Sequence, residues 1–205
     1  MNAGATALWA AAISCAACSE QPHSSAVTAS PPGWQCGATG AGSPKWAMEG
    51  DPTLGRPIIK QSGTAAYPWC IKPEINLTDG FAEVRFKSLS GKQDQAGGLV
   101  WRWQNGDNYY VARANALENN LSLYYTQNGT RHTIQYVDAP VAPLVWHDLR
   151  VEFKGTWIKV FLDGKRYIDT QDSHIGGGGS AGIWTKADSV TEFDEFNAGA
   201  LTNAP

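Results

Sequence analysis

The chain lacks any run of like charge. Its 16 Lys and Arg residues nearly balance its 19 Asp and Glu residues, so the formal net charge is only −3. Proteins that bind nucleic acid or anionic membranes carry a basic patch that attracts phosphate groups. The composition therefore argues against nucleic acid as a partner, and against attachment to a membrane through surface charge.

Methionine is scarce, and no segment has a convincing helical periodicity. The two Met residues stand beside nine Trp, seven Tyr and six Phe. This composition predicts a β-rich protein whose aromatic side chains serve both the core and the surface. Short apolar runs separated by turn residues predict twelve strands, around residues 46–50, 58–61, 82–88, 99–104, 109–115, 121–126, 132–137, 146–154, 157–162, 166–170, 181–186 and 190–198.

These short strands, with turns every eight to twelve residues, favour an all-β fold. We expect a two-sheet antiparallel β-sandwich of the jelly-roll kind in preference to a closed barrel. The pair Asp163-Gly164, between two apolar runs, predicts a tight two-residue hairpin. In the strand before it, Leu149, Val151 and Phe153 form an apolar side opposite a charged side, as expected for a strand with a core face and a solvent face.

No apolar run is long enough to span a bilayer. Residues 1–18 are small and apolar and end in Cys15-Ala16-Ala17-Cys18, which resembles a bacterial lipoprotein signal. This resemblance implies lipidation of Cys18, with Cys15 as the alternative, and hence an exported protein anchored in the bacterial cell envelope. Residues 19–33 are rich in Ser, Pro and Ala, as in a flexible tether. Residues 34–200 are then one domain, which we expect to be monomeric.

Cysteine is also sparse. The C-x-x-C of Cys15 and Cys18 lacks the flanking strand and helix of a redox motif. In an exported protein the other two, Cys36 and Cys70, most simply form a disulfide, closing a loop that contributes about 3 kcal/mol to stability. Two buried free thiols are the alternative.

The most informative segment runs from Gly97 to Gly129, where aromatic, Arg and Asn residues alternate with a period of two. A turn at Asn105-Gly106-Asp107-Asn108 closes its first hairpin. If Gln104 pairs with Tyr109, one face carries Arg102, Gln104, Tyr109, Arg113 and Asn115, and the opposite core face carries Leu99, Trp101, Trp103, Tyr110, Ala112 and Ala114. The polar face either binds sugar hydroxyls or is a solvated surface on which Arg stems cover aromatic rings.

Three segments resemble one family of folds: Gly98–Arg102 with Asn108–Asn120, Trp146–Val151, and Gly182–Val190 through Phe196. They are similar to the concanavalin A-like sandwiches that include laminin-G-like modules and the bacterial 3-keto-disaccharide hydrolase domains. The resemblance covers roughly residues 80–198 and implies a carbohydrate-related function. Because this fold hosts lectins, glycosidases, lyases and adhesion modules, it does not specify an activity.

The segment Glu192-Phe193-Asp194-Glu195-Phe196 superficially resembles the acidic strand of family glycosidases. Strand alternation places Glu192 and Asp194 on one side and Glu195 on the other, and Phe196 stands where the second acid belongs. A retaining glycosidase of the ordinary two-carboxylate kind is therefore disfavoured. Asp194 is interpreted as a structural acid.

The resemblance to 3-keto-disaccharide hydrolases implies an elimination that needs a base and a group to hold enolate charge. Glu118 is the candidate base, and Arg113, Lys186 or Arg102 would stabilise the oxyanion. The candidate substrate-binding residues are Arg102, Tyr109, Asn115, Trp184 and Asp188, of which Trp184, Lys186 and Asp188 are expected on one strand face. A divalent cation such as calcium, held by Asp188, Asn115 or Glu118, is a further implication without firm ligand spacing, and His132 and His147 suggest no metal cluster.

The leading hypothesis is thus an exported carbohydrate-active domain that cleaves 3-keto-glycosides or a related sugar linkage. The alternative is a non-catalytic glycan-binding or adhesion module, and a third reading is a purely structural envelope protein. The enzyme requires Arg113, Asn115 and Glu118 to converge in one pocket, whereas a binding module requires only an open aromatic groove.

Overall fold

The structure is a computed structural model that describes residue 1 and residues 30–201. The segment that resembles a lipoprotein signal and nearly all of the expected tether lie outside these residues. Lipidation of Cys18 or Cys15 therefore stays a prediction. No helix in the described part of the chain is long and apolar enough to cross a membrane.

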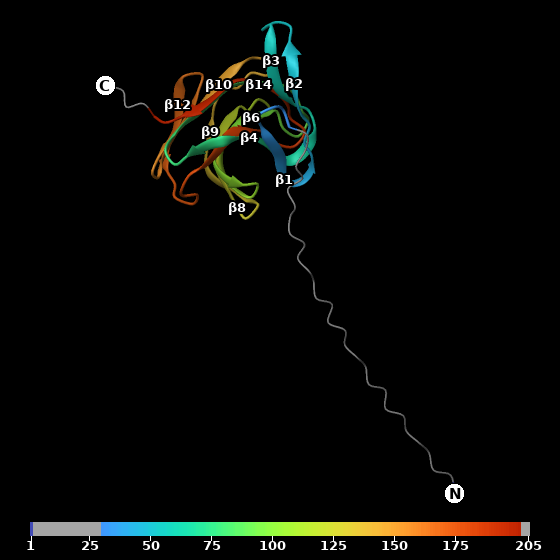
Figure 1. Ribbon diagram of the computed structural model, residues 1–205, viewed down its shortest axis with the longest axis vertical. Coiled ribbons are helices and arrows are strands. Elements are labelled where there is room, and N and C mark those ends of the chain that lie inside the picture. Colours follow the sequence, from blue (N-terminus) through green and yellow to red (C-terminus); the bar gives the residue numbers. More distant parts are fainter. Residues whose placement is uncertain (2–29, 202–205) are drawn as a thin grey trace.

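The fold is a sandwich of two seven-stranded antiparallel sheets, which confirms the predicted class (Figure 1). Sheet A has the order β1-β4-β13-β6-β7-β8-β9, and sheet B has the order β12-β11-β10-β5-β14-β3-β2. The strands are β1 (Gln35–Ser43), β2 (Trp46–Asp51), β3 (Arg56–Gln61), β4 (Thr64–Leu77), β5 (Gly80–Ser90), β6 (Ala96–Asn105), β7 (Asn108–Asn115), β8 (Asn120–Gln127), β9 (Thr130–Asp138), β10 (His147–Lys154), β11 (Trp157–Leu162), β12 (Lys165–Gln171), β13 (Gly179–Trp184) and β14 (Val190–Gly199).

Two of these strands, β1 and β4, were not among the twelve expected. Strand β1 has the sequence QCGATGAGS, whose small residues carry no apolar alternation, so its pairing along β4 decides its conformation. Cys36 and Cys70 face each other directly in that pairing and form the predicted disulfide. The bond ties the edge strand of sheet A to its neighbour.

The main core lies between the two sheets. Leu149, Val151 and Phe153 of β10 are buried there, while the alternating charged residues of that strand face outward, as predicted. The hairpin at Asp163-Gly164 also forms, with both residues at positive φ. Opposite Phe86 of sheet B, sheet A has Gly97, where an added Cβ would lie 2.1 Å from the Phe86 ring. The absence of a side chain at that position lets the two sheets pack closely.

Sheet A is strongly curled, so its outer face is concave. Arg131 of β9 lies 4.7 Å from the ring of Tyr67 on β4, although four strands separate β4 from β9 in the sheet. Five strand spacings would place these residues about 24 Å apart in a flat sheet, beyond the reach of both side chains. A second apolar cluster fills the concave face, formed by Trp69, Ile71, Val100, Tyr109, Val111, Tyr124 and Trp184, with Tyr67 and Trp103 packed against it.

The expected position of Arg102 is wrong. Between Trp101 and Asn105 the register of β6 shifts against β7, and Arg102 adopts a φ of 45°. The irregular backbone turns the Arg102 side chain away from the concave face to the other side of the sheet, where its guanidinium lies over the Phe153 ring. The same shift moves Trp103 out of the expected core face and against Trp69 on the concave face.

We expect the disulfide to contribute about 3 kcal/mol to the free energy of unfolding, because it closes a loop between residues 34 apart and restricts the unfolded chain. Urea denaturation of the full-length chain and of the Cys36→Ala/Cys70→Ala variant measures this difference. A reducing agent should lower the wild-type midpoint and leave the variant unchanged. Equal stability of the two oxidised proteins would contradict the prediction.

Candidate functional site

A network of charged and polar side chains lies where β7 ends and β8 begins, at the rim of the concave face. Arg113 is the centre of this network and is 2% exposed. One of its terminal nitrogens lies 2.7 Å from Glu118 Oε2 and the other 3.1 Å from Asp94 Oδ2. Lys186 Nζ reaches the same Asp94 oxygen at 2.8 Å. We call this set the Arg113 cluster: Asp94, Arg113, Glu118, Asn120, Tyr136 and Lys186.

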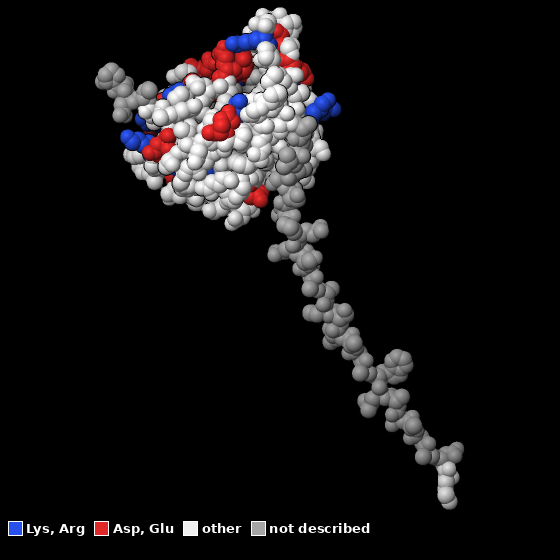
Figure 2. Space-filling model, viewed as in Figure 1, with Lys and Arg blue, Asp and Glu red and all other residues white. Residues whose placement is uncertain are grey.

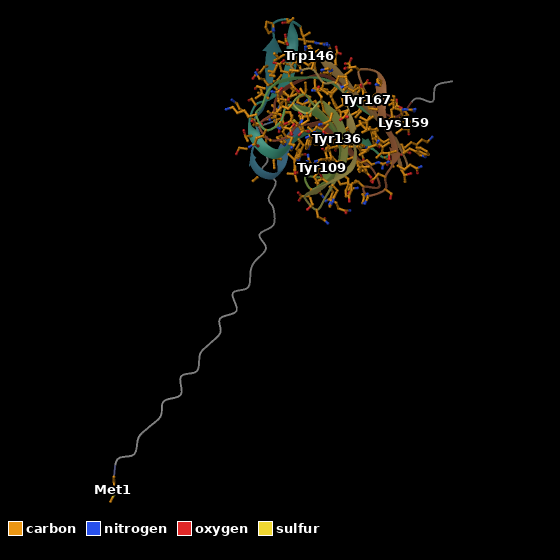
Figure 3. The ribbon with its side chains drawn as sticks, turned by 180° about the vertical axis from the view of Figure 1, so that it is seen from behind. Met1, Tyr109, Tyr136, Trp146, Lys159 and Tyr167 are labelled. Carbon is orange, nitrogen blue, oxygen red and sulfur yellow. A yellow bond between two sulfur atoms is a disulfide. The ribbon has the colours of Figure 1, made fainter. Side chains whose placement is uncertain are left out.

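Asn120 connects Glu118 to Tyr136 on the neighbouring strand β9. Its side-chain nitrogen donates to Glu118 Oε2 at 2.8 Å and to the Tyr136 hydroxyl at 2.6 Å, while its oxygen accepts from Arg113 at 3.1 Å. The Glu118 side chain is 44% exposed and Tyr136 is 52% exposed. Buried groups therefore hold exposed ones in a defined arrangement. Figure 3 shows Tyr136 and Tyr109 on the strands of the curled sheet.

Asp94 is a member that sequence reasoning missed. It lies in the loop between β5 and β6, where a polar residue carries no periodic signal, and it is fully buried. The loop is shaped by Gly91, whose φ is 151° and where an added Cβ would lie 1.8 Å from the Asp94 carbonyl oxygen. In the sequence, Gly91 was the one sign of an ordered loop here, because only glycine lets the backbone of Asp94 lie so close.

The structure brings together the three candidate catalytic residues. Glu118 contacts Arg113 directly, and Lys186 joins them through Asp94. Asn115 does not converge with them, because its side-chain oxygen accepts from the backbone N–H groups of Leu117 at 2.9 Å and Gln95 at 3.4 Å. The convergence of all three side chains that the enzyme hypothesis requires is therefore not met, although Arg113 and Glu118 do contact each other.

The candidate substrate-binding residues take up other positions. Arg102 donates to the backbone carbonyls of Thr78, Ile175 and Gly155, and is 3% exposed. Tyr109 and Trp184 are buried completely. The Tyr109 hydroxyl lies 2.6 Å from the Thr39 hydroxyl, and burial raises its pKa. These three side chains hold the sheet together and have no free surface for a ligand.

Trp184, Lys186 and Asp188 do not share a strand face, because β13 ends at Trp184 and Ala187 has a φ of 54°. Asp188 instead accepts hydrogen bonds from the backbone N–H groups of Lys92, Gln93 and Asp94, at 2.7, 3.0 and 3.1 Å. Although burial opposes the shift, these donors keep the pKa of Asp188 below its ordinary value. Asp188 therefore holds the loop between β5 and β6, which contains Asp94, in place.

The aromatic floor beside the Arg113 cluster was also not identified from the sequence. Tyr67 stacks on Trp184 with ring centroids 5.9 Å apart. The Arg131 guanidinium lies 4.2 Å from the Tyr124 ring and 4.7 Å from the Tyr67 ring. These residues come from β4, β8, β9 and β13, strands whose side chains meet only because the sheet curls.

The carboxyl groups of this region are already engaged. The hydrogen bond from Asn120 and the charge of Arg113 hold the pKa of Glu118 below its ordinary value, against the opposing effect of partial burial. The oxygens proposed for a divalent cation, on Asp188, Asn115 and Glu118, accept from N–H donors. Among the described residues no three His, Cys, Asp or Glu side chains group as metal ligands. These oxygens are hydrogen-bond acceptors within the protein's own network.

The comparisons with known proteins bear on the fold. No protein-family model matches the chain, and no curated protein matches it. Among solved structures, the carbohydrate-binding module CBM66 from Bacillus subtilis has a TM-score of 0.67 at 21% identity, over 82% of this chain and 96% of that one. The exoplasmic/lumenal domain of VIP36, bound to Ca²⁺ and Man3GlcNAc, has a TM-score of 0.60 at 13% identity, over 85% and 86%. A Bacillus licheniformis β-glucanase has a TM-score of 0.56 at 13% identity, over 84% and 94%.

At these identities the likenesses establish the sandwich fold. They extend across both a binding module and a hydrolase. The choice between the two rests on the chemistry of this chain's own residues.

We expect Glu118 to titrate at a lower pH in the folded protein than in the unfolded chain. Carbon-13 NMR of the carboxyl group across acid pH, without and with urea, measures both values. Because the folded pKa is depressed, the stabilisation is present above the unfolded pKa and is lost as pH falls through the folded pKa. Glu118→Gln should remove this part of the acid sensitivity, and equal folded and unfolded titration points would contradict the assignment.

We expect Asp94→Asn to lower the free energy of unfolding by about 3 kcal/mol, because it leaves the buried Arg113 without its full counter-charge. Urea denaturation measures the change. Asp138→Asn, at an exposed carboxylate on β9, is the matched control and should have little effect. A similar loss in both variants would show that the buried ion pair is not its cause.

Proposed function

We propose that the protein binds carbohydrate, and that the Arg113 cluster at the rim of the concave face is the binding site. The observation that carries this proposal is that exposed Glu118 and Tyr136 and half-buried Lys186 are held by the buried residues Arg113, Asp94 and Asn120. Such an arrangement presents a carboxylate, an ammonium and a phenol at fixed positions. Sugar hydroxyl groups can both donate to and accept from groups of this kind.

Several further features support this chemistry. The cluster lies beside aromatic rings, and binding sites for polar organic ligands commonly combine an apolar wall with a few fixed polar groups. The net charge of −3 and the absence of a basic stripe argue against a polyanionic ligand. The likeness in fold to a carbohydrate-binding module and to a sugar-bound lumenal domain is consistent with the same ligand class.

Binding without turnover is the better supported role. A general base works best when its pKa is near the operating pH. The hydrogen bond from Asn120 and the charge of Arg113 instead lower the pKa of Glu118. A carboxylate stabilised in this way accepts hydrogen bonds well and removes carbon-bound protons poorly.

Elimination from a 3-keto-glycoside is the second candidate, favoured by one observation. Glu118, Arg113 and Lys186 belong to one connected network, as the reaction would require. In that reaction the ketone acidifies the neighbouring C–H, Glu118 takes the proton, Arg113 and Lys186 hold the enolate charge, and the glycosidic oxygen leaves with the bonding electrons. Export and anchoring of Cys18 by lipid are part of the proposal for either activity.

We expect Glu118→Gln and Tyr136→Ala each to weaken glycan binding about tenfold, since each removes at least one hydrogen bond or ring contact to the ligand. A glycan array with the full-length chain identifies the ligand, and isothermal titration calorimetry measures the affinities. Val145→Ala, at an exposed apolar residue in the loop between β9 and β10, is the control and should bind as wild type. Unchanged affinity in both cluster variants would refute this site.

The same proteins should be incubated with 3-keto-glucosides and with ordinary glucosides to measure release of the leaving group. No release by folded protein that binds glycans would leave binding as the function. Release confined to keto substrates and abolished in Glu118→Gln would instead establish the elimination enzyme.

A further inference from the structure

The outer face of sheet B has a groove that the Arg113 cluster does not reach. One hollow, of about 650 Å³, lies over β14, β5, β10 and β11. A second, of about 370 Å³, lies beside Trp157 on β11 and reaches Asp169 on β12. Glu152 lines both hollows, so they adjoin at this side chain, and we refer to the two together as the groove.

The strand registers give the groove a definite order. Across the sheet, Glu83 of β5 faces Arg150 of β10, which faces Phe161 of β11. The next outward-facing row runs from Phe81 through Glu152 to Lys159 and Asp169, and the row after it holds Lys154 and Trp157. Outward-facing rows lie about 7 Å apart along a strand, so the groove from the Arg85–Asp148 row to Trp157 is about 20 Å long. This length suits a chain of several sugar rings.

The polar side chains of the groove are held in fixed positions. Arg150 donates to Glu83 at 2.5 Å and to Glu152 at 3.0 Å, and Asn197 donates to Glu83 at 3.0 Å. Arg150 also lies 4.2 Å from the ring of Phe81, which restrains its plane. Ordered planar groups of this kind can bind hydroxyl groups in two directions without a large loss of side-chain entropy.

Charge in this groove is paired and slightly acidic. The larger hollow is lined by Glu83, Asp148, Glu152 and Glu195 against Arg85 and Arg150. Figure 2 shows acidic side chains gathered at the end of the molecule that carries β2, β3 and β14, with basic side chains next to them. An excess of acids disfavours phosphorylated or acidic polysaccharides, and both arginines are already paired with these acids, so neither is a free cation for an anionic group. The ligand that fits is a neutral glycan.

Trp157 supplies an aromatic platform at one end. It is 53% exposed, and among the tryptophans in the described part of the chain it alone is classed as exposed. Its neighbours in the hollow include Lys159 and Asp169, the latter paired with Arg166. An indole ring beside polar groups can stack on the C–H face of a sugar while those groups bind its hydroxyls. Figure 3 shows Lys159 on the side from which the C-terminus leaves, and Trp146 near the β2–β3 hairpin.

We infer that this groove is a second carbohydrate site, separate from the Arg113 cluster, which binds a neutral oligosaccharide along the outer face of sheet B with Trp157 as its stacking platform. The ligand class rests on the proposed function, whereas the location and the need for several sugar rings rest on the groove itself. The two sites lie on opposite sheets. One molecule would therefore bind two segments of glycan and gain avidity on a polysaccharide surface.

The test is NMR titration of the nitrogen-15-labelled full-length chain, with the Trp157 indole signal assigned by its loss in Trp157→Phe. The probes are laminarihexaose, cellohexaose and mannohexaose, each beside its monosaccharide. A hexasaccharide should shift the Trp157 indole and Arg150 side-chain signals at submillimolar concentration, and the monosaccharide should not. Trp157→Ala should weaken these groove shifts about tenfold, Trp157→Phe less, and Leu144→Ala, an exposed control outside both sites, not at all.

Variants of the other face separate the two proposals. In Glu118→Gln the groove shifts should persist, and in Trp157→Ala the shifts around the Arg113 cluster should persist. If Glu118→Gln abolishes all binding, or if no hexasaccharide moves the Trp157 signal at several millimolar, the second site is refuted while the Arg113 cluster is judged on its own shifts. If groove shifts occur without shifts around the Arg113 cluster, the proposed function loses its site and the groove retains its own.

Discussion

The central strands of sheet A are buried on both faces, and most other features of the structure depend on this. One face packs against sheet B, and the other curls until β9 side chains meet those of β4. A strand in this position has no solvent side, so Val100 and Val111 are as buried as Leu99 and Ala112 on the opposite face. Binding groups on this sheet are consequently restricted to its rim. Sheet B buries one face and leaves its outer face free for charged side chains.

Because the concave face is buried, the charge of Arg113 needs the partners that the Arg113 cluster provides. An arginine that is almost inaccessible to water must have its charge compensated, and removal of a partner from a buried pair is far more costly than loss of a surface pair. Asp94 and Glu118 provide that compensation from two different loops, and Asp188 keeps the first loop in place. The same contacts that stabilise the sheet therefore fix Glu118, Lys186 and Tyr136 at the surface. Stability and recognition share one set of hydrogen bonds here.

The sequence predicted features that depend on local periodicity and on turn chemistry. The two-sheet fold, the Asp163-Gly164 hairpin, the core face of β10 and the pairing of Cys36 with Cys70 are confirmed. Periodicity failed at Arg102, because a backbone irregularity shifts every later side chain of β6, and nothing in QNGDN reports it. Periodicity also failed to show that the outer face of sheet A is buried by the curl of the sheet and is not exposed to solvent.

The candidate site shows the same limit. Arg113, Glu118 and Lys186 were identified by residue type, and they do belong together. Asp94, which connects them, comes from a loop 19 residues before Arg113, and its proximity depends on long-range packing. Trp184 was expected to form a sugar platform, and curvature of the sheet buried it beneath Tyr67. Sheet curvature is a cumulative property of many strands, and no single segment encodes it.

Both proposed sites consist of groups that already bond to one another, and this affects how a ligand would be recognised. Binding exchanges existing hydrogen bonds and bound water for bonds to sugar hydroxyls, so the net gain per bond is modest. Selectivity then comes from the positions of donors, acceptors and aromatic rings more than from charge. A module with weak individual sites gains most from contacts on two faces, because attachment at one face raises the effective concentration of glycan at the other. The sandwich suits this role, since the packed core between the sheets sets the separation of the two faces.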